Sequence, residues 1–270
     1  MTLNELSSKA YYKNEYGIIL NMDCVEAMKL MPDECVDLTV TSPPYDNLRV
    51  YNGFSWNFES TAKELYRITK QGGVVVWVVG DATIKGSETG TSFKQALYFK
   101  EIGFNLHDTM IYHKINPIPQ NHNRYEQSFE YMFVLSKGKP KTFNPIKEPT
   151  KNAGKEFDWG NRKTIMDKNQ CRRNRGTDKI KVSENKTKQN IFSYSVGGSK
   201  TGHPAVFPEA LANDHIISWS NENDIVFDPF MGSGTTAKMA MLNNRKFIGC
   251  ELNENYCEII KERLENVERN

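Results

Sequence analysis

The chain has 270 residues, a length that suits one large domain or two small ones with a buried core. Hydrophobic residues make up 38% and charged residues 25% of the sequence, as in ordinary globular proteins. It contains no run of about 18 apolar residues and no apolar core near its start, so we expect neither a membrane span nor a signal peptide. The five cysteines are scattered and lack the CxxC spacing of a zinc site, which predicts free thiols in a reducing cytoplasm and no bound metal.

The net charge of +2 is unevenly distributed. Residues 141–190 contain 14 Lys and Arg against 6 Asp and Glu, a local charge of +8, so the rest of the chain carries −6. A basic segment on an otherwise acidic chain indicates a face for a polyanion. A solvated, lysine-rich loop explains the same charges equally well, and charge alone leaves both interpretations open.

Strand and helix signals alternate along most of the chain, as they do in βαβ units. The apolar run at 73–80, GVVVWVVG, is typical of a strand buried on both faces of a parallel sheet. The expected strands are 17–21, 36–41, 73–80, 105–113, 130–136, 225–227 and 246–250, and the expected helices are 25–30, 59–69, 93–102, 203–218, 235–242 and 256–267. This alternation predicts an α/β fold with a mainly parallel sheet.

Apolar periodicity nearly vanishes between residues 138 and 199, where Asn, Lys, Gly and Thr dominate. Such inserts usually serve as functional loops or small recognition modules. We therefore expect three parts, which are residues 15–137, the insert at 138–199, and residues 200–270.

A glycine-rich segment, DPFMGSGTT at 228–236, follows a short apolar strand and opens a helix. Gly232 and Gly234 let the backbone turn sharply near a ligand, and the helix N-terminus suits a carboxylate or phosphate. Glu251 ends the next strand, where an acidic residue can hold ribose hydroxyls. NAD and S-adenosylmethionine both carry a ribose, so these residues do not separate the two, and a purely structural glycine turn is the plainer alternative.

A second segment, TSPPY at 41–45, ends a buried strand with two prolines that neither a helix nor a central strand tolerates. The Ser42 hydroxyl and the Pro43 carbonyl can both accept hydrogen bonds from an amino group, and Tyr45 can stack on a flat ring. This arrangement predicts the pocket of a base-flipping enzyme. An ordinary strand stop with a surface tyrosine is the alternative.

Weaker signals come from HPAVFP at 203–208 and from two aspartates, Asp23 and Asp81. Phe207 could cover one side of an adenine, whereas His203 is more typical of a turn than of a catalytic site. Each aspartate follows a strand end, where ligands bind in open α/β sheets, but each also suits a helix cap.

Together, these motifs resemble those of the amino-methylating DNA methyltransferases in their β arrangement. In that arrangement the base-binding motif comes first, a target-recognition insert follows, and the FxGxG cofactor motif comes last, as TSPPY, the basic insert and DPFMGSGT do here. The resemblance extends from about residue 17 to 267. It implies a circularly permuted, Rossmann-like, mainly parallel seven-stranded sheet, in which strand 17–21 lies beside strand 246–250 and strands 105–113 and 130–136 form a reversed hairpin.

The resemblance also implies S-adenosyl-L-methionine as cofactor and double-stranded DNA as substrate. The residues it assigns to the cofactor are Asp23, His203, Pro204, Phe207, Asp228, Pro229, Phe230, Gly232, Ser233, Gly234, Thr235 and Glu251. Those assigned to the base and to catalysis are Ser42, Pro43, Pro44 and Tyr45. Within the basic insert, Arg172, Arg173 and Arg175 are candidates for guanine or phosphate contacts.

In families of this kind, Ser before Pro-Pro goes mostly with methylation of cytosine N4, and Asp mostly with that of adenine N6. Ser42 therefore favours cytosine N4, with adenine N6 as the alternative. Methylation at carbon 5 of cytosine would need a reactive cysteine after a proline, and none of the five follows one.

Three other functions compete with this interpretation. An NAD-dependent oxidoreductase would need a substrate domain, but only 36 residues follow Gly234 and TSPPY would stay unexplained. A catalytically silent nucleic-acid-binding module and an RNA methyltransferase stay open, although the long basic insert and the permuted order favour DNA. The sequence leaves open whether a cognate restriction endonuclease is a partner, and whether the protein is a monomer or a homodimer.

Overall fold

The computed structural model describes residues 3–44, 57–117, 119, 123–157, 180–195 and 208–268. The chain divides into two compact units. The larger unit contains Met1–Asn144 and Asn190–Asn270, and the smaller unit is Pro145–Gln189.

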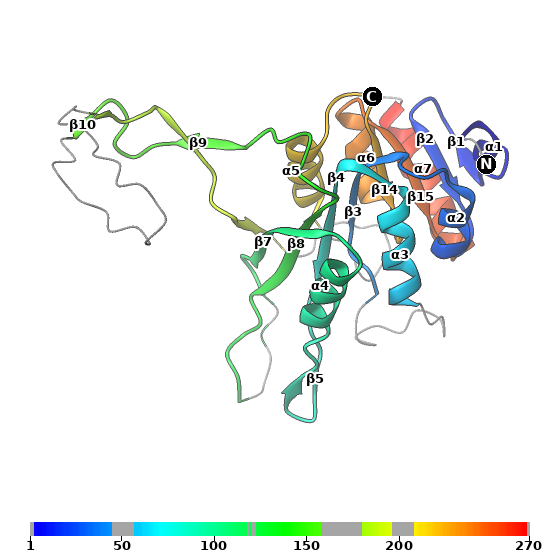
Figure 1. Ribbon diagram of the computed structural model, residues 1–270, viewed down its shortest axis with the longest axis horizontal. Helices are drawn as coiled ribbons and strands as arrows, with labels where there is room; N and C mark the ends of the chain where they lie inside the picture. Colours follow the sequence, from blue (N-terminus) through cyan, green and yellow to red (C-terminus); the bar gives the residue numbers. More distant parts are fainter. Residues whose placement is uncertain are drawn as a thin grey trace. The chain divides into compact units, whose positions relative to one another are not determined.

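A nine-stranded sheet forms the centre of the larger unit, in the order β1-β2-β15-β14-β3-β4-β8-β7-β13 (Figure 1). The strands are β1 (Tyr12–Lys13), β2 (Gly17–Leu20), β3 (Val36–Thr41), β4 (Thr69–Val79), β7 (Asn105–Lys114), β8 (Phe129–Ser136), β13 (Ile191–Tyr194), β14 (Ile225–Asp228) and β15 (Lys246–Cys250). Within the described sheet, β1 runs antiparallel to β2 and β8 runs antiparallel to both β4 and β7, whereas the other neighbouring strands are parallel. The predicted Rossmann-like, mainly parallel fold is confirmed, with β1 and β13 added at the edges of the seven expected strands.

The permuted connection predicted from the motif order is present in the sheet. Strand β2 pairs in parallel with β15, in a register that places Gly17 opposite Phe247 and Leu20 opposite Cys250. A Cβ at Gly17 would lie 2.0 Å from the Phe247 carbonyl oxygen, so only glycine fits where these strands begin. The predicted reversed hairpin is also confirmed, because β8 lies antiparallel between β4 and β7.

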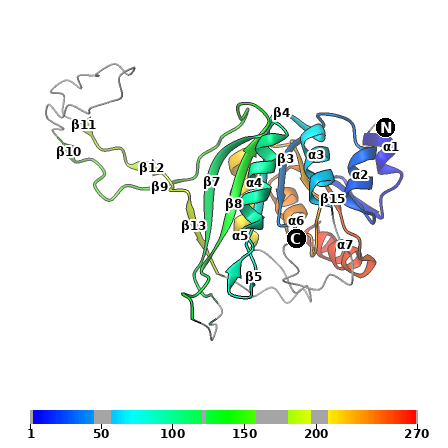
Figure 2. The same ribbon diagram turned by 60° about the horizontal axis from the view of Figure 1, so that its bottom comes forward.

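Helices cover both faces of the sheet (Figure 2). They are α1 (Leu3–Ser7), α2 (Cys24–Leu30), α3 (Phe58–Ile68), α4 (Thr91–Glu101), α5 (Glu209–Trp219), α6 (Thr235–Leu242) and α7 (Glu254–Glu268). On one face α3 packs between α2 and α4, and on the other α6 packs between α5 and α7. The helix expected at 203–218 begins at Glu209, and residues 203–207 lie outside the described residues. Among the described helices, none is long and apolar enough to cross a membrane.

In the smaller unit, the residues that the structure describes form two short antiparallel strand pairs. Strand β9 (Lys147–Pro149) pairs with β12 (Asn185–Thr187), and β10 (Glu156–Phe157) pairs with β11 (Ile180–Lys181). A further small hairpin, β5 (Thr83–Ile84) with β6 (Ser87–Glu88), belongs to the larger unit. The insert expected at 138–199 is wider than this smaller unit, because β13 pairs with β7 and so belongs to the main sheet.

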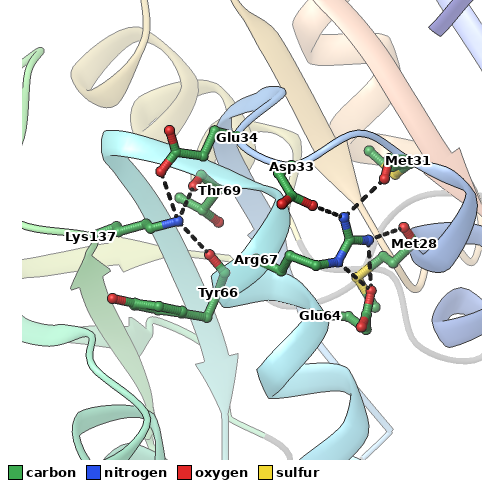
Figure 3. A network of polar contacts seen from close by, with 9 residues as sticks. All are labelled: Met28, Met31, Asp33, Glu34, Glu64, Tyr66, Arg67, Thr69 and Lys137. Atoms are coloured by element: carbon green, nitrogen blue, oxygen red, sulfur yellow. Dashed lines mark hydrogen bonds and ion pairs between the residues drawn. The ribbon is translucent and has the colours of Figure 1, made fainter. Parts of the chain in front are cut away.

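Arg67 on α3 joins two helices through main-chain carbonyls (Figure 3). Its guanidinium donates to the carbonyls of Met28 and Met31, at 2.5 and 3.0 Å, where α2 ends. It also forms ion pairs with Asp33 and Glu64. A cation at a helix C-terminus satisfies carbonyls that have no partner within the helix.

Lys137, which directly follows β8, likewise binds main-chain carbonyls at the end of α3 (Figure 3). Its ammonium donates to the carbonyls of Tyr66 and Thr69, both at 3.0 Å, and pairs with Glu34 at 3.1 Å. These contacts lie where β3 and β4 begin, at the edge of the sheet opposite the carboxyl ends of those strands. We therefore interpret the network as a structural brace.

Replacing Arg67 with Ala is expected to lower the free energy of unfolding by about 2–4 kcal/mol, because it removes the donor from two carbonyls and from two carboxylates. Urea denaturation measures this change. The control is Lys261→Ala, which breaks a more exposed ion pair with Glu258 on α7 and should change the free energy of unfolding much less than Arg67→Ala does. Equal losses in the two variants would contradict the structural role of Arg67.

Candidate functional site

The two main sequence motifs begin side by side at the centre of the sheet. Strands β3 and β14 are parallel neighbours, with Val226 opposite Leu38. At their carboxyl ends the Thr41 hydroxyl donates a hydrogen bond of 2.7 Å to Asp228. Because ligands bind at the carboxyl ends of strands in open α/β sheets, this edge is the candidate site.

Asp228 is a buried carboxylate, with 2% of its surface exposed. Its Oδ1 accepts hydrogen bonds from Thr41 Oγ1 and, at 3.0 Å, from the main-chain N–H of Phe230. Burial raises the pKa of Asp228 to about 6, although these hydrogen bonds act in the opposite direction. The group is therefore ionised at neutral pH, and its ionised form costs folding free energy.

The glycine-rich loop depends on two left-handed residues, Gly232 with φ of 52° and Gly234 with φ of 78°. Gly234 lies directly before α6, and a Cβ there would lie 2.6 Å from the Ile260 side chain. Both the backbone conformation and the packing therefore require glycine at 234. The loop places the first residues of α6 at the same edge of the sheet as Ser42.

Glu251 supports the loop from the end of β15. Its Oε2 accepts from the Gly232 N–H and its Oε1 accepts from the Asn253 N–H, each at 2.9 Å. Burial is the largest cause of a raised pKa for this carboxyl. Each carboxylate oxygen can accept a further hydrogen bond, so Glu251 suits a ligand with a pair of hydroxyl groups.

Asp23 acts as the N-cap of α2. Its Oδ1 accepts from the main-chain N–H groups of Val25 and Glu26, at 2.8 and 3.1 Å. The neighbouring Asn21 donates to the carbonyls of Glu251 and Leu252, which ties the end of β2 to the end of β15. Asp23 thus lies at the predicted edge, and its contact with a cofactor stays a prediction.

An aromatic cluster that we did not predict from the sequence lies behind the loop. The half-buried Phe230 ring meets the fully buried Trp77 ring edge-on, with 6.4 Å between the ring centroids. On the same Trp77 ring packs Phe58, with a centroid distance of 6.2 Å. Trp77 lies opposite Thr41 in the β3–β4 pair and donates its indole N–H to Gln95 at 2.8 Å. The sequence analysis named Phe230 as a cofactor residue and β4 as a buried strand, but neither signal indicated that the Phe230 and Trp77 rings meet.

The structure describes some of the predicted site residues and leaves others outside the described part of the chain. Ser42 and Pro44 are half-buried and Pro43 is buried, directly after β3. Pro229 follows Asp228 and is buried, while Ser233 and Thr235 are buried and bonded to Arg263, a residue that sequence reasoning missed. The predicted residues outside the described part of the chain are Tyr45, Arg172, Arg173, Arg175, His203, Pro204 and Phe207.

Four of the five cysteines are free and buried in the described part of the chain. Burial raises the pKa of Cys24 and Cys257 to about 12 and that of Cys35 to about 11, and it also raises the pKa of Cys250. These four are therefore neutral thiols at physiological pH and lack the thiolate that a cysteine nucleophile needs. Cys171 lies outside the described residues.

Replacing Asp228 with Asn should stabilise the fold above pH 6. The folded-state pKa of about 6 lies above the unfolded value of ~3.9, so the native state of the wild type loses stability as pH rises through this interval. The variant lacks that loss, which amounts to about 2–3 kcal/mol when complete. Thermal unfolding at pH 5 and pH 8 should show a larger advantage for Asp228→Asn at pH 8. An advantage that is larger at pH 5 would contradict the raised pKa.

Comparison with known proteins identifies the family of this chain. A family model of N6- and N4-methyltransferases, described as DNA methylase, matches residues 36–262. The orphan methyltransferase M.BamHII of Bacillus amyloliquefaciens is 58% identical, over 87% of this chain and 90% of that protein. The type II methyltransferase M.SmaI of Serratia marcescens is 29% identical, over 90% of this chain and 88% of that protein.

Solved structures share the fold. The PvuII DNA methyltransferase (cytosine-N4-specific) superposes with a TM-score of 0.69 at 20% identity, covering 97% of this chain and 94% of its own. The complex of M1.HpyAVI with S-adenosylmethionine gives 0.61 at 24% identity, covering 92% and 100%. With the family match over most of the sequence and the identity to M.BamHII, these likenesses establish that the chain belongs to the N6/N4 DNA methylase family, whose members are DNA amino-methyltransferases.

Proposed function

We propose that this protein transfers a methyl group from S-adenosyl-L-methionine to the exocyclic N4 of a cytosine that is flipped out of DNA. The observation that carries the proposal is the hydrogen bond between Thr41 and Asp228. It holds the start of the base-binding segment, Ser42-Pro43-Pro44, beside the start of the glycine-rich loop. An amine held by the first segment would therefore face a ligand held by the second.

The methyl donor is S-adenosyl-L-methionine, the molecule named in the M1.HpyAVI complex and in a complex of TTHA0409 from Thermus thermophilus, which has a TM-score of 0.62 at 23% identity and covers 92% of this chain and 93% of its own. The residues present suit it. Each carboxylate oxygen of Glu251 accepts one main-chain N–H and can accept a further hydrogen bond from a ribose hydroxyl, and the loop at Gly232–Gly234 leads into the N-terminus of α6. When bound, the donor supplies a methyl carbon made electrophilic by a sulfonium.

The chain's own residues prepare the amine. The amino nitrogen of cytosine is a poor nucleophile because its lone pair is delocalised into the ring. Ser42 Oγ and the Pro43 carbonyl would accept hydrogen bonds from the two N–H groups of this nitrogen. These hydrogen bonds would favour a more tetrahedral nitrogen, with its lone pair aimed at the methyl carbon. A nitrogen–carbon bond forms as the carbon–sulfur bond breaks and its electron pair stays on sulfur. The extra proton on nitrogen then leaves to water.

Direct transfer also agrees with the state of the cysteines. A covalent mechanism at carbon 5 would require a thiolate, and the raised pKa values of the four described cysteines disfavour one. Ser42 before Pro-Pro supports cytosine N4 as the target. Adenine N6 is the second candidate, because its amino group offers the same two N–H bonds.

DNA would be held in part by the basic segment at 141–190, with Arg172, Arg173 and Arg175 as the proposed contacts. The relative with 58% identity is named an orphan methyltransferase. We therefore propose that this protein methylates DNA without a dedicated restriction endonuclease, and the alternative is that it has a cognate endonuclease.

Product analysis tests the reaction. The protein is incubated with S-adenosyl-L-methionine and unmethylated DNA of varied sequence, and the DNA is digested to nucleosides for mass spectrometry. We expect N4-methylcytosine. N6-methyladenine would keep the chemistry but overturn the target base, and 5-methylcytosine or an absence of methylated nucleosides would overturn the proposal.

Replacing Ser42 with Ala should lower kcat by roughly 100-fold, the usual effect of losing one preorganised polar contact to the reacting group. The dissociation constant of S-adenosyl-L-methionine, measured by calorimetry, should stay within about twofold of the wild type because Ser42 contacts the base. Ser87→Ala, on the exposed β5–β6 hairpin, is the control. Equal losses of kcat and cofactor affinity in Ser42→Ala would count against the assigned role.

Replacing Arg172, Arg173 and Arg175 together with Ala should weaken DNA binding and reduce the slope of log K against log salt by up to about three, if each contacts a phosphate. Cofactor affinity should not change. The matched control replaces three exposed lysines on α2, α3 and α4, which are Lys29, Lys63 and Lys100. The same loss in both triple variants would show that only the total charge matters.

A further inference from the structure

Arg263 of α7 reaches across to the glycine-rich loop. The two N–H groups of its Nη1 are shared among three acceptors, which are the Ser233 carbonyl at 2.8 Å, the Ser233 hydroxyl at 3.1 Å and the Thr235 hydroxyl at 3.2 Å. The side chain is only 12% exposed. A planar guanidinium donates in fixed directions, so these three contacts fix the loop conformation between Gly232 and the first turn of α6.

Glu209 holds Arg263 from the other side. One carboxylate oxygen of Glu209 accepts from Arg263 Nη2 at 2.5 Å and from Lys238 Nζ of α6 at 2.7 Å. These two cations outweigh partial burial and lower the pKa of Glu209, so the carboxylate is charged at neutral pH. Helices α5, α6 and α7 thus meet in one ion-pair network.

This network is not what helix stability alone would select. Arg263 places a full positive charge at the N-terminus of α6, where the helix dipole already favours anions. A neutral or acidic partner would stabilise that helix end better. The cation is instead tolerated because Glu209 balances it, which suggests that the arrangement serves the loop conformation.

The position of Glu209 in the chain links a second segment to the loop. It is the first residue of α5 and follows Pro208, the last residue of the HPAVFP segment. The network therefore connects the loop to the start of α5, directly after the segment whose His203, Pro204 and Phe207 the family resemblance assigns to the cofactor.

We infer that Arg263 and Glu209 act together as positioning residues for the cofactor: Arg263 sets the loop, and Glu209 sets Arg263. This inference rests on the proposed function. It predicts that disrupting the pair raises the dissociation constant and the KM of S-adenosyl-L-methionine, while kcat at saturating cofactor stays close to that of the wild type.

Four variants test the pair, which are Glu209→Gln, Arg263→Lys, Arg263→Met and the double variant Glu209→Gln/Arg263→Met. The measurements are the dissociation constant of S-adenosyl-L-methionine by calorimetry, kcat and KM with DNA, and the melting temperature. Glu258→Gln is the matched control, because it makes the same change to an ion pair with Lys261 on the same helix α7.

We expect Glu209→Gln to weaken cofactor binding roughly tenfold, and Arg263→Met more strongly. Arg263→Lys should recover part of the loss, and the double variant should lose little more than Arg263→Met, since coupled residues are not additive. Glu258→Gln should bind as the wild type does.

Wild-type affinity in Glu209→Gln, or additive losses in the double variant, would overturn the inference. Losses of kcat at saturating cofactor equal to the losses of affinity would also overturn it, by assigning the pair to the overall fold or to the chemical step. A wild-type protein that does not bind S-adenosyl-L-methionine would instead overturn the proposed function, so the two failures are distinguishable.

Discussion

The site depends on one hydrogen bond, which the Thr41 hydroxyl donates to the buried carboxylate of Asp228 across 187 positions of sequence. Both residues end central parallel strands, and the chain leaves each strand in a segment with unusual backbone requirements. Two prolines follow Ser42, and two left-handed glycines follow Pro229. The interaction fixes where these segments begin, at the cost of a buried charge whose pKa is raised to about 6. A fold selected for stability alone would not keep that charge.

Parallel strand order explains how motifs from the two ends of the chain meet. The carboxyl ends of β2, β15, β14, β3 and β4 lie along one edge, so Asp23, Glu251, Asp228, Thr41 and the strand of Trp77 share that edge whatever the order of connections. Permutation changes which loop joins the strands and leaves the edge intact. Asn21 bridges the end of β2 to the chain after β15 and closes the connection locally.

Local patterns predicted seven of the nine strands described in the central sheet, and most of these seven carry a short apolar run, as β3, β4 and β15 do. The pairing of β2 with β15 followed from the resemblance to permuted methyltransferases. Strand β13 was missed because it has only four residues and lies within a polar stretch, too short for its alternation to stand out as a strand signal. Its pairing with β7 shows that it belongs to the sheet.

Side-chain partnerships between distant segments were beyond sequence reasoning. Nothing around Arg263 or Glu209 indicates that the two meet at the glycine-rich loop, since 54 residues separate them. Asp23 was ambiguous for a different reason. Its place after a strand suited either a ligand contact or a helix cap, and the structure shows it as the N-cap of α2.

A crystal structure with S-adenosyl-L-homocysteine bound tests most directly whether the two motifs form one site. We expect the ribose hydroxyls within hydrogen-bond distance of Glu251 and the sulfur facing Ser42 across the edge of β3 and β14. A ligand bound at another edge of the sheet, or a sulfur directed away from Ser42, would contradict this account.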